Sequence, residues 1–223
     1  MTITVYGSKI STYTLRVLVT LSELDVRDYK WAPVNMAAPV KEHHSHEFKS
    51  NLQPFGQVPV MHDDDCDLTL FESRAIARYL AEKFHSQGTP LLGTTPREKA
   101  LVNQWIEVES QNFNKPVGQI LLHTVFSKNY GITGSPEVVE ENLEKLEKVL
   151  DVYEAHLARS KYLAGDFFSL ADLHHLPATN LLIDVAKKGH VFESRPHVSS
   201  WWKSISSRPA FRDCLAFQKS PGP

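Results

Sequence analysis

Cysteine is scarce in this chain of 223 residues, because only Cys66 and Cys214 occur and neither has metal-ligand spacing. A disulfide framework is therefore not expected, and the usage fits a reducing compartment. The sequence also lacks a signal peptide's basic start and apolar core. No apolar run approaches the roughly 20 residues of a membrane span. We expect a cytoplasmic protein with no membrane partner.

Neither sign of charge dominates, since 24 Lys and Arg residues oppose 26 Asp and Glu residues for a net charge of −2. No global field therefore favours nucleic acid as a partner. Hydrophobic residues make up 42% and charged residues 22% of the chain, which is typical of a soluble globular protein and argues against disorder. The protein must recognise its ligand through a local site.

Residues 1–83 mix strand and helix patterns. Alternating polar and apolar residues predict strands, and apolar residues three and four apart predict helices. The acidic turn at 63–65 indicates an antiparallel hairpin. The expected order βαβ and then ββα is a thioredoxin-like arrangement. Its elements are a strand over 2–6, a helix around 15–21, a strand over 31–34, a hairpin of 58–61 with 68–71, and a helix over 73–84.

Strand patterns end after a polar linker over 84–92, which carries Gly and Pro. Apolar residues between Val139 and Leu157 then recur at spacings of four and three, which predicts one long amphipathic helix. Ser169 and Asp172 form a capping-box pattern that begins another helix. We expect an α/β plus all-α protein, with a thioredoxin-like domain over 1–83 and a helical-bundle domain over 93–223.

The motifs resemble those of a known family. Pro54-Phe-Gly-Gln-Val-Pro59, followed by Leu70-Phe-Glu-Ser-Arg-Ala-Ile76, resembles the glutathione-binding core of glutathione S-transferases, particularly the plant-type phi class. Gly7-Ser-Lys-Ile-Ser11 resembles the loop that carries that class's catalytic serine. The resemblance covers nearly the whole chain. It implies a homodimeric detoxification enzyme that joins glutathione, a co-substrate, to hydrophobic electrophiles and needs no cofactor.

Ser11 lies between the first predicted strand and helix, and the resemblance implies that it is catalytic. The thiolate of glutathione is the nucleophile, and a hydroxyl that donates a hydrogen bond to sulfur stabilises the charged form. A helix N-terminus adds a favourable partial charge. Position alone also fits an ordinary N-cap. Thr12 and Tyr13 remain alternative donors, and Ser8 is a weaker candidate.

The resemblance also implies the glutathione contacts. A cis Pro59 directs the backbone of Val58 toward the cysteinyl unit, which pairs as an added strand, and Gln57 accompanies it. Glu72 would pair with the γ-glutamyl ammonium. Ser73, at a helix N-terminus, would bind the γ-glutamyl carboxylate. Without the resemblance, these residues would be interpreted as an edge-strand proline and a routine helix start.

Here the sequence departs from the phi pattern, which has Glu-His-Lys where this chain has Glu42-His-His44. Either His43 or His44 takes the position near the glycyl carboxylate, and the missing lysine removes a permanent positive charge. Binding is then expected to depend on pH, because histidine titrates near neutrality. His43, His44 and His46 also permit chelation, but no obvious fourth ligand is nearby, and no metal site is expected.

The electrophile is expected in a cleft between the halves, with apolar lining residues. The same residues fit core packing equally well. The candidates are Ile10, Met36, Phe113, Val117 and Leu121.

Two other functions compete with conjugation. A thiol-disulfide or dehydroascorbate reductase of this fold needs a cysteine at position 11, where this chain has Ser11. A non-catalytic carrier of hydrophobic ligands would use the same cleft and stays open. An activated glutathione thiolate would also reduce hydroperoxides, so a glutathione-dependent peroxidase activity is compatible with the same site.

Overall fold

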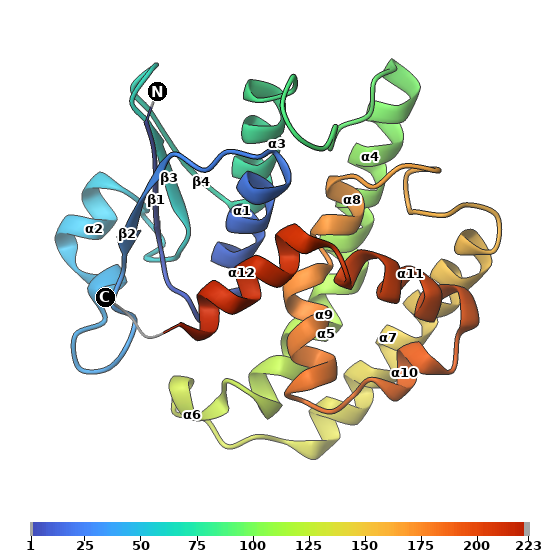
Figure 1. Ribbon diagram of the computed structural model, residues 1–223. Coiled ribbons are helices and arrows are strands. Elements are labelled where there is room, and N and C mark those ends of the chain that lie inside the picture. The colour runs from blue at the N-terminus through green and yellow to red at the C-terminus, as the bar shows by residue number, and fades with distance from the viewer. Residues whose placement is uncertain (1, 221–223) are drawn as a thin grey trace. The chain divides into compact units, whose positions relative to one another are not determined.

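The computed structural model describes residues 2–220 (Figure 1). Contacts divide the chain into two compact units, residues 1–90 with 209–223, and residues 91–208. The last helix, α12 (Pro209–Lys219), therefore belongs to the first unit, although it follows the second unit in the sequence.

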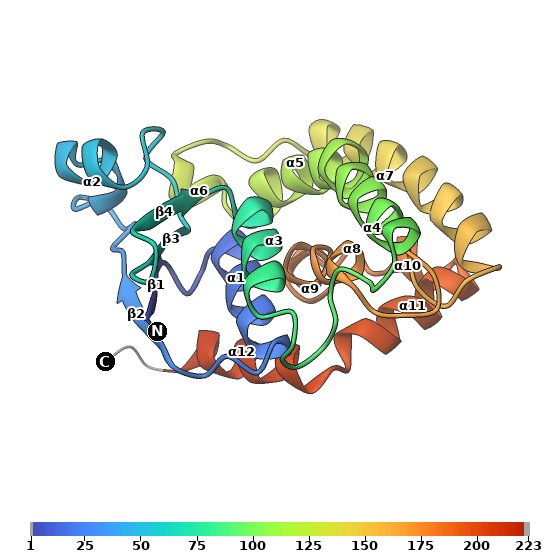
Figure 2. The ribbon, with the colours of Figure 1, turned by 90° about the horizontal axis from the view of Figure 1, so that it is seen from above.

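The first unit is built on a four-stranded sheet in the order β2-β1-β3-β4. Figures 1 and 2 show α1 and α3 on one face of this sheet and α2 on the other. The βαβ and then ββα order confirms the predicted thioredoxin-like domain. The elements are β1 (Ile3–Gly7), α1 (Thr12–Glu23), β2 (Tyr29–Pro33), η1 (Glu42–His44), α2 (His46–Asn51), β3 (Val60–Asp63), β4 (Leu68–Phe71) and α3 (Ser73–Lys83).

Two details of the first unit differ from the sequence-based expectation. The hairpin's first strand begins at Val60 rather than Val58. Pro59 has no N–H to donate to a neighbouring strand, so the ladder cannot extend through it. The short helices η1 and α2 were not predicted, because six or fewer residues carry too little periodicity to be recognised.

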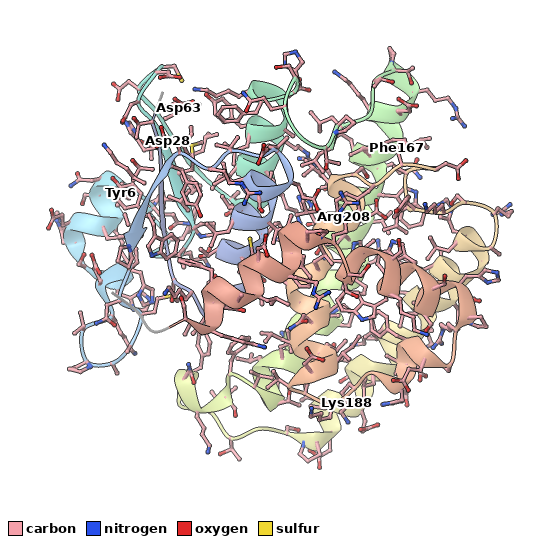
Figure 3. The ribbon with its side chains drawn as sticks, viewed as in Figure 1. Tyr6, Asp28, Asp63, Phe167, Lys188 and Arg208 are labelled. Atoms are coloured by element: carbon pink, nitrogen blue, oxygen red, sulfur yellow. The ribbon has the colours of Figure 1, made fainter. Side chains whose placement is uncertain are left out.

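A small apolar cluster holds the segment before β3 against the sheet. Val34, Phe48, Val58 and Val60 are buried together, and Tyr6 of β1 (labelled in Figure 3) packs against them. Burial of such side chains is the main favourable term in folding. The position of Val58 is therefore fixed by the same core that supports α2.

Asp63 connects the hairpin to α3, and its position at the end of β3 is visible in Figure 3. The side chain is fully buried and accepts hydrogen bonds from Tyr79 and Lys83, and from the Asp65 N–H at 3.0 Å. Burial by itself would raise the pKa of Asp63, but the bonds from Lys83, Tyr79 and Asp65 lower it below its usual value. Asp63 is therefore a paired structural carboxylate.

The second unit is helical, as predicted. Within it α5 contacts α7 and α9, and α11 contacts α7 and α9. The predicted long helix is α7, capped by Ser135, and the predicted capping box of Ser169 and Asp172 is present at α8. The elements are α4 (Pro96–Val108), η2 (Glu109–Phe113), α5 (Asn114–Thr124), α6 (Ser127–Tyr130), α7 (Pro136–Leu157), α8 (Leu170–Leu173), α9 (Leu176–Asp184), α10 (His190–Glu193) and α11 (Pro196–Ser206).

Asp172 organises the start of α8 from a fully buried position. Its carboxylate accepts hydrogen bonds from the N–H groups of Leu163 and Ser169, from the Ser169 hydroxyl, and from the Trp201 indole, at 2.9–3.2 Å. Burial raises the pKa of Asp172 to about 6, although these four donors oppose the shift. Trp201 is thus a core residue of the second unit.

Among residues 2–220, no helix is long and apolar enough to cross a membrane. The same part of the chain contains no group of three or more His, Cys, Asp or Glu side chains placed to hold a metal ion.

Candidate functional site

One edge of the sheet gathers most of the candidate residues. Tyr6 of β1 pairs with Val60 of β3, and Val60 pairs with Phe71 of β4. The chain after β1, the chain before β3 and the chain after β4 therefore leave the sheet at the same end. These are the segments that contain Ser11, Val58 with Pro59, and Glu72 with Ser73, so strand register alone brings the three groups to one edge.

Ser11 is the N-cap of α1, half-buried, and its Oγ accepts a hydrogen bond from the Thr14 N–H at 3.2 Å. Within residues 2–220 the hydroxyl proton itself has no acceptor. The cap role and the catalytic role are compatible, because one uses the oxygen lone pair and the other uses the proton. The hydroxyl lies at the positive end of α1.

Thr12 and Tyr13 are the first two residues of α1. Thr12 is half-buried and Tyr13 is 40% exposed, with the Arg16 guanidinium 5.4 Å from its ring centroid. Both side chains begin on the same helical turn as the Ser11 cap. The choice of donor among the three therefore stays a prediction.

The Val58–Pro59 peptide bond is cis, as the resemblance implies. Val58 is buried, and among the described residues its backbone N–H and C=O have no hydrogen-bond partner. The neighbouring Gln57 side chain is exposed. The backbone N–H of Gln57 donates a hydrogen bond to the side-chain oxygen of Gln53 at 3.2 Å. The backbone of Val58 thus offers one donor and one acceptor to an extended peptide.

Glu72 precedes α3 with φ 69° and ψ 103°, a conformation that residues with a side chain rarely adopt. Its side chain makes no capping bond to the helix. Glu72 therefore does not use its carboxylate to cap the first N–H groups of α3. A non-glycine residue held in such a conformation often marks a functional site.

Ser73 is buried, and its Oγ accepts a 2.7 Å hydrogen bond from Nη1 of Arg16. Arg16 is 1% exposed, so a buried cation from α1 stands behind the N-terminus of α3. The bond occupies the Ser73 oxygen and leaves its proton for another acceptor. The role of Arg16 was not predicted, because a long side chain inside a helix pattern gives no sign of where its charged end lies.

His43 and His44 lie beside the Gly56–Gln57 segment. A Cβ on Gly56, which has φ +66°, would be 2.7 Å from the His43 carbonyl oxygen and 3.1 Å from the His44 ring. His43 is buried, with Nδ1 unpaired among residues 2–220, whereas His44 is exposed. Burial, followed by the charges of His44, Lys41 and Lys49, lowers the pKa of His43, against an opposing bond to the Asn35 backbone.

Two lysines bring positive charge to the region of His43 and His44. The sequence predicted the loss of one lysine here, but Lys49 of α2 lies against the same loop, since its Cε would be 2.8 Å from a Cβ on Gly56. Lys41 and Lys49 both act on the charge of His43. The sequence did contain these lysines, but only the fold of η1 and α2 shows that they converge near the two histidines.

The candidate electrophile contacts fall into two groups. Ile10 is 54% exposed in the Ser11 loop, and Met36 packs against the apolar cluster around Val58. Phe113 and Val117 are fully buried in the second unit, and Leu121 is 4% exposed. Core packing, the alternative interpretation of their spacing, is what the structure shows for these three. Contact with an electrophile stays a prediction for all five.

Comparison with known proteins identifies the family. The model of the glutathione S-transferase N-terminal domain matches residues 1–82, and that of the C-terminal domain matches residues 113–209. Glutathione S-transferase F9 of Arabidopsis thaliana is 44% identical, with 99% of this chain and 100% of the relative covered.

Solved structures agree with these matches. Glutathione transferase F7 of Populus trichocarpa superposes with a TM-score of 0.90 at 43% identity, with 98% of this chain and 100% of that chain covered. Maize glutathione S-transferase I, solved with an atrazine glutathione conjugate, gives 0.85 at 40% identity, with 99% of both chains covered.

A thioredoxin-like unit with a cis proline before β3, followed by a helical unit, together with these matches defines a glutathione-dependent enzyme. The chain belongs to the glutathione S-transferase family, and within it to the phi class. It is a transferase, like the full-length relatives that carry that name.

Proposed function

We propose that this transferase ionises the thiol of glutathione by a hydrogen bond from Ser11. The observation that carries the proposal is the Ser11 hydroxyl, whose oxygen accepts from Thr14 while its proton has no acceptor among residues 2–220. A cysteine-type thiol titrates near pH 8.5, so most of it is protonated at neutral pH. Donation to the thiolate, beside the positive end of α1, lowers that value.

The rest of glutathione would bind along the same sheet edge. The cysteinyl backbone would pair with the free N–H and C=O of Val58. The γ-glutamyl carboxylate would accept from Ser73 at the N-terminus of α3, and Glu72 would pair with the ammonium. The glycyl carboxylate would lie near Gln57 and the histidine pair, where exposed His44 is the more accessible partner.

The thiolate would attack the electrophilic carbon of a hydrophobic small molecule. A sulfur–carbon bond forms, the bond to the leaving group breaks, and the thiol proton passes to solvent. Maize glutathione S-transferase I, 40% identical, was solved with an atrazine glutathione conjugate, which supports this substrate class. The same thiolate would reduce hydroperoxides, with two glutathione molecules oxidised to the disulfide as the peroxide becomes an alcohol and water.

We further propose a cytoplasmic homodimer, on the basis of the family. Light scattering of the purified protein tests the dimer. A particle of twice the mass of one chain is expected, and a monomer that conjugates glutathione at full rate would contradict it.

The deciding experiment is ultraviolet thiolate absorbance of bound glutathione against pH, for wild type and for Ser11→Ala, Thr12→Ala and Tyr13→Phe. The midpoint should lie below that of free glutathione, and Ser11→Ala alone should raise it. Conjugation by Ser11→Ala should fall roughly 10- to 100-fold in kcat/KM, the effect of one bond to a charged group.

Other outcomes assign the role differently. A raised midpoint in Thr12→Ala or Tyr13→Phe, with Ser11→Ala unchanged, would transfer the role to that residue. Binding of hydrophobic ligands without any conjugation would favour the carrier.

A further inference from the structure

The loop that carries Ser11 is hydrogen-bonded to residues at the end of α12. Gln218, near the end of α12, donates a 2.6 Å hydrogen bond from Nε2 to the backbone carbonyl of Lys9. The Lys9 ammonium donates to Ser220 Oγ at 3.2 Å and lies 4.5 Å from the ring centroid of Phe217. The Phe217 ring in turn packs edge-on against Trp31 of β2 at 5.7 Å.

These contacts all lie within the first unit, which contains α12 as well as the sheet. Figures 1 and 2 show α12 running beside α1, and the two helices are in contact. The end of α12 therefore reaches the loop between β1 and α1, although 209 residues separate Lys9 from Gln218 in sequence.

The hydrogen bonds that the loop makes to itself are of ordinary length or longer. The Ser11 N–H donates to the Ser8 carbonyl at 3.0 Å, and the Leu15 N–H donates to the Ser11 carbonyl at 2.9 Å. The loop's side-chain bonds, from the Ser8 N–H to Thr14 Oγ1 and from the Thr14 N–H to Ser11 Oγ, measure 3.3 Å and 3.2 Å. Both are longer than the usual 2.9–3.0 Å for an N–H donor. The 2.6 Å bond from Gln218 is the shortest that the described residues provide to this loop, and it acts two residues before Ser11.

We propose that Gln218 is a positioning residue for Ser11, which fixes the loop through the Lys9 carbonyl so that the Ser11 hydroxyl stays aimed at the glutathione thiol. This inference rests on the proposed function, because it needs Ser11 to be the thiol's partner. Lys9 adds a second attachment through Phe217 and Ser220. A hydrogen bond to a thiolate depends on distance and angle, so a looser loop stabilises the thiolate less.

The consequence is confined to thiol activation. Among residues 2–220, no hydrogen bond joins α12 to Val58, Glu72 or Ser73, the residues that would bind the tripeptide. Loss of the Gln218 bond should therefore reduce kcat and raise the thiolate midpoint while the KM for glutathione changes little. If the substitution only destabilised α12, it would change both kcat and KM, or the amount of folded protein. It would not move the thiolate midpoint.

The test uses Gln218→Met, which keeps the length of the side chain but removes the donor, and Lys219→Met as the matched control at the exposed neighbouring position. The thiolate midpoint and the kinetics are measured in wild type, in both variants, and in the Ser11→Ala and Ser11→Ala/Gln218→Met proteins. Gln218→Met should raise the midpoint and lower kcat roughly two- to tenfold, and Lys219→Met should match wild type. In the Ser11→Ala background, Gln218→Met should add nothing.

An unchanged thiolate midpoint in Gln218→Met would overturn the positioning role. So would an equal rise of the midpoint when Gln218→Met is added to the Ser11→Ala protein. A wild-type midpoint equal to that of free glutathione would instead overturn the proposed function itself. The first failure appears in the Gln218→Met variants and the second in the wild-type protein, so the two are distinguishable.

Discussion

The buried guanidinium of Arg16 in α1 donates a 2.7 Å hydrogen bond to the hydroxyl of Ser73, the first residue of α3. Ser11 and Glu72, the residues proposed to act on the thiol and the γ-glutamyl group, directly precede these two helices. One side-chain contact thus couples the two ends of the proposed glutathione site.

Ser73→Ala should affect both stability and binding. Loss of the acceptor leaves a buried Arg16 donor less satisfied, so the free energy of unfolding should fall by about 1–3 kcal/mol. Glutathione affinity should weaken roughly tenfold, because one donor to the carboxylate is lost. Denaturant unfolding and calorimetric titration measure the two effects, with Ser86→Ala at an exposed loop position as control. Unaltered affinity would remove Ser73 from the site.

Substitutions of Glu72 should affect the stability of the protein and its affinity for glutathione in different ways. Its φ of 69° strains any residue with a Cβ, whereas glycine adopts positive φ readily. Glu72→Gly should therefore be more stable than Glu72→Ala by about 1 kcal/mol. Both variants should lose affinity for glutathione by a similar factor. Thermal unfolding and titration of the pair check this, and a Glu72→Ala protein as stable as Glu72→Gly would show that the backbone carries no strain.

The glycyl end of the site should depend on the exposed side chain of His44, which lies beside the Gly56–Gln57 segment. His44→Gln should weaken the binding of S-methylglutathione roughly threefold, because the glycyl carboxylate loses a partner. His46→Gln, at an exposed position on the same segment, should match wild type. Calorimetric titration measures both affinities. An affinity unchanged in His44→Gln would exclude a dominant histidine contact.

Asp172 should make the second unit less stable as pH rises. Burial raises the pKa of its carboxyl from 3.8 to about 6, so the folded state binds more protons than the unfolded state between these values. Its contribution to stability is fully present below about pH 4 and is lost as pH rises to about 6. Relative to Asp172→Asn, wild type should lose about 3 kcal/mol over this range.

Denaturant unfolding at pH 4 and pH 7 measures that difference. Asp172→Asn will carry a constant penalty from its altered hydrogen bonds, which cancels in the comparison between the two pH values. A difference that is the same at both would show that the carboxyl is ionised with an ordinary pKa.

Sequence by itself determined the family and most of the elements. Strand alternation, the helical period of α7 and the Ser169–Asp172 capping box are local patterns, so residues within a few positions specify them. The motifs around Ser11, Pro59 and Ser73 marked the proposed site through their resemblance to the phi class.

Only the tertiary structure decided how distant residues meet. Arg16 and Ser73 are 57 residues apart, and Lys9 and Gln218 are 209 residues apart. No periodic pattern in the sequence relates residues at such separations. Burial likewise depends on what packs from elsewhere, which is why Phe113 and Val117 lie in a core that their helical spacing alone left ambiguous. Side-chain contacts across the fold are set by the sheet register and helix packing, and these arise only once the whole chain has folded.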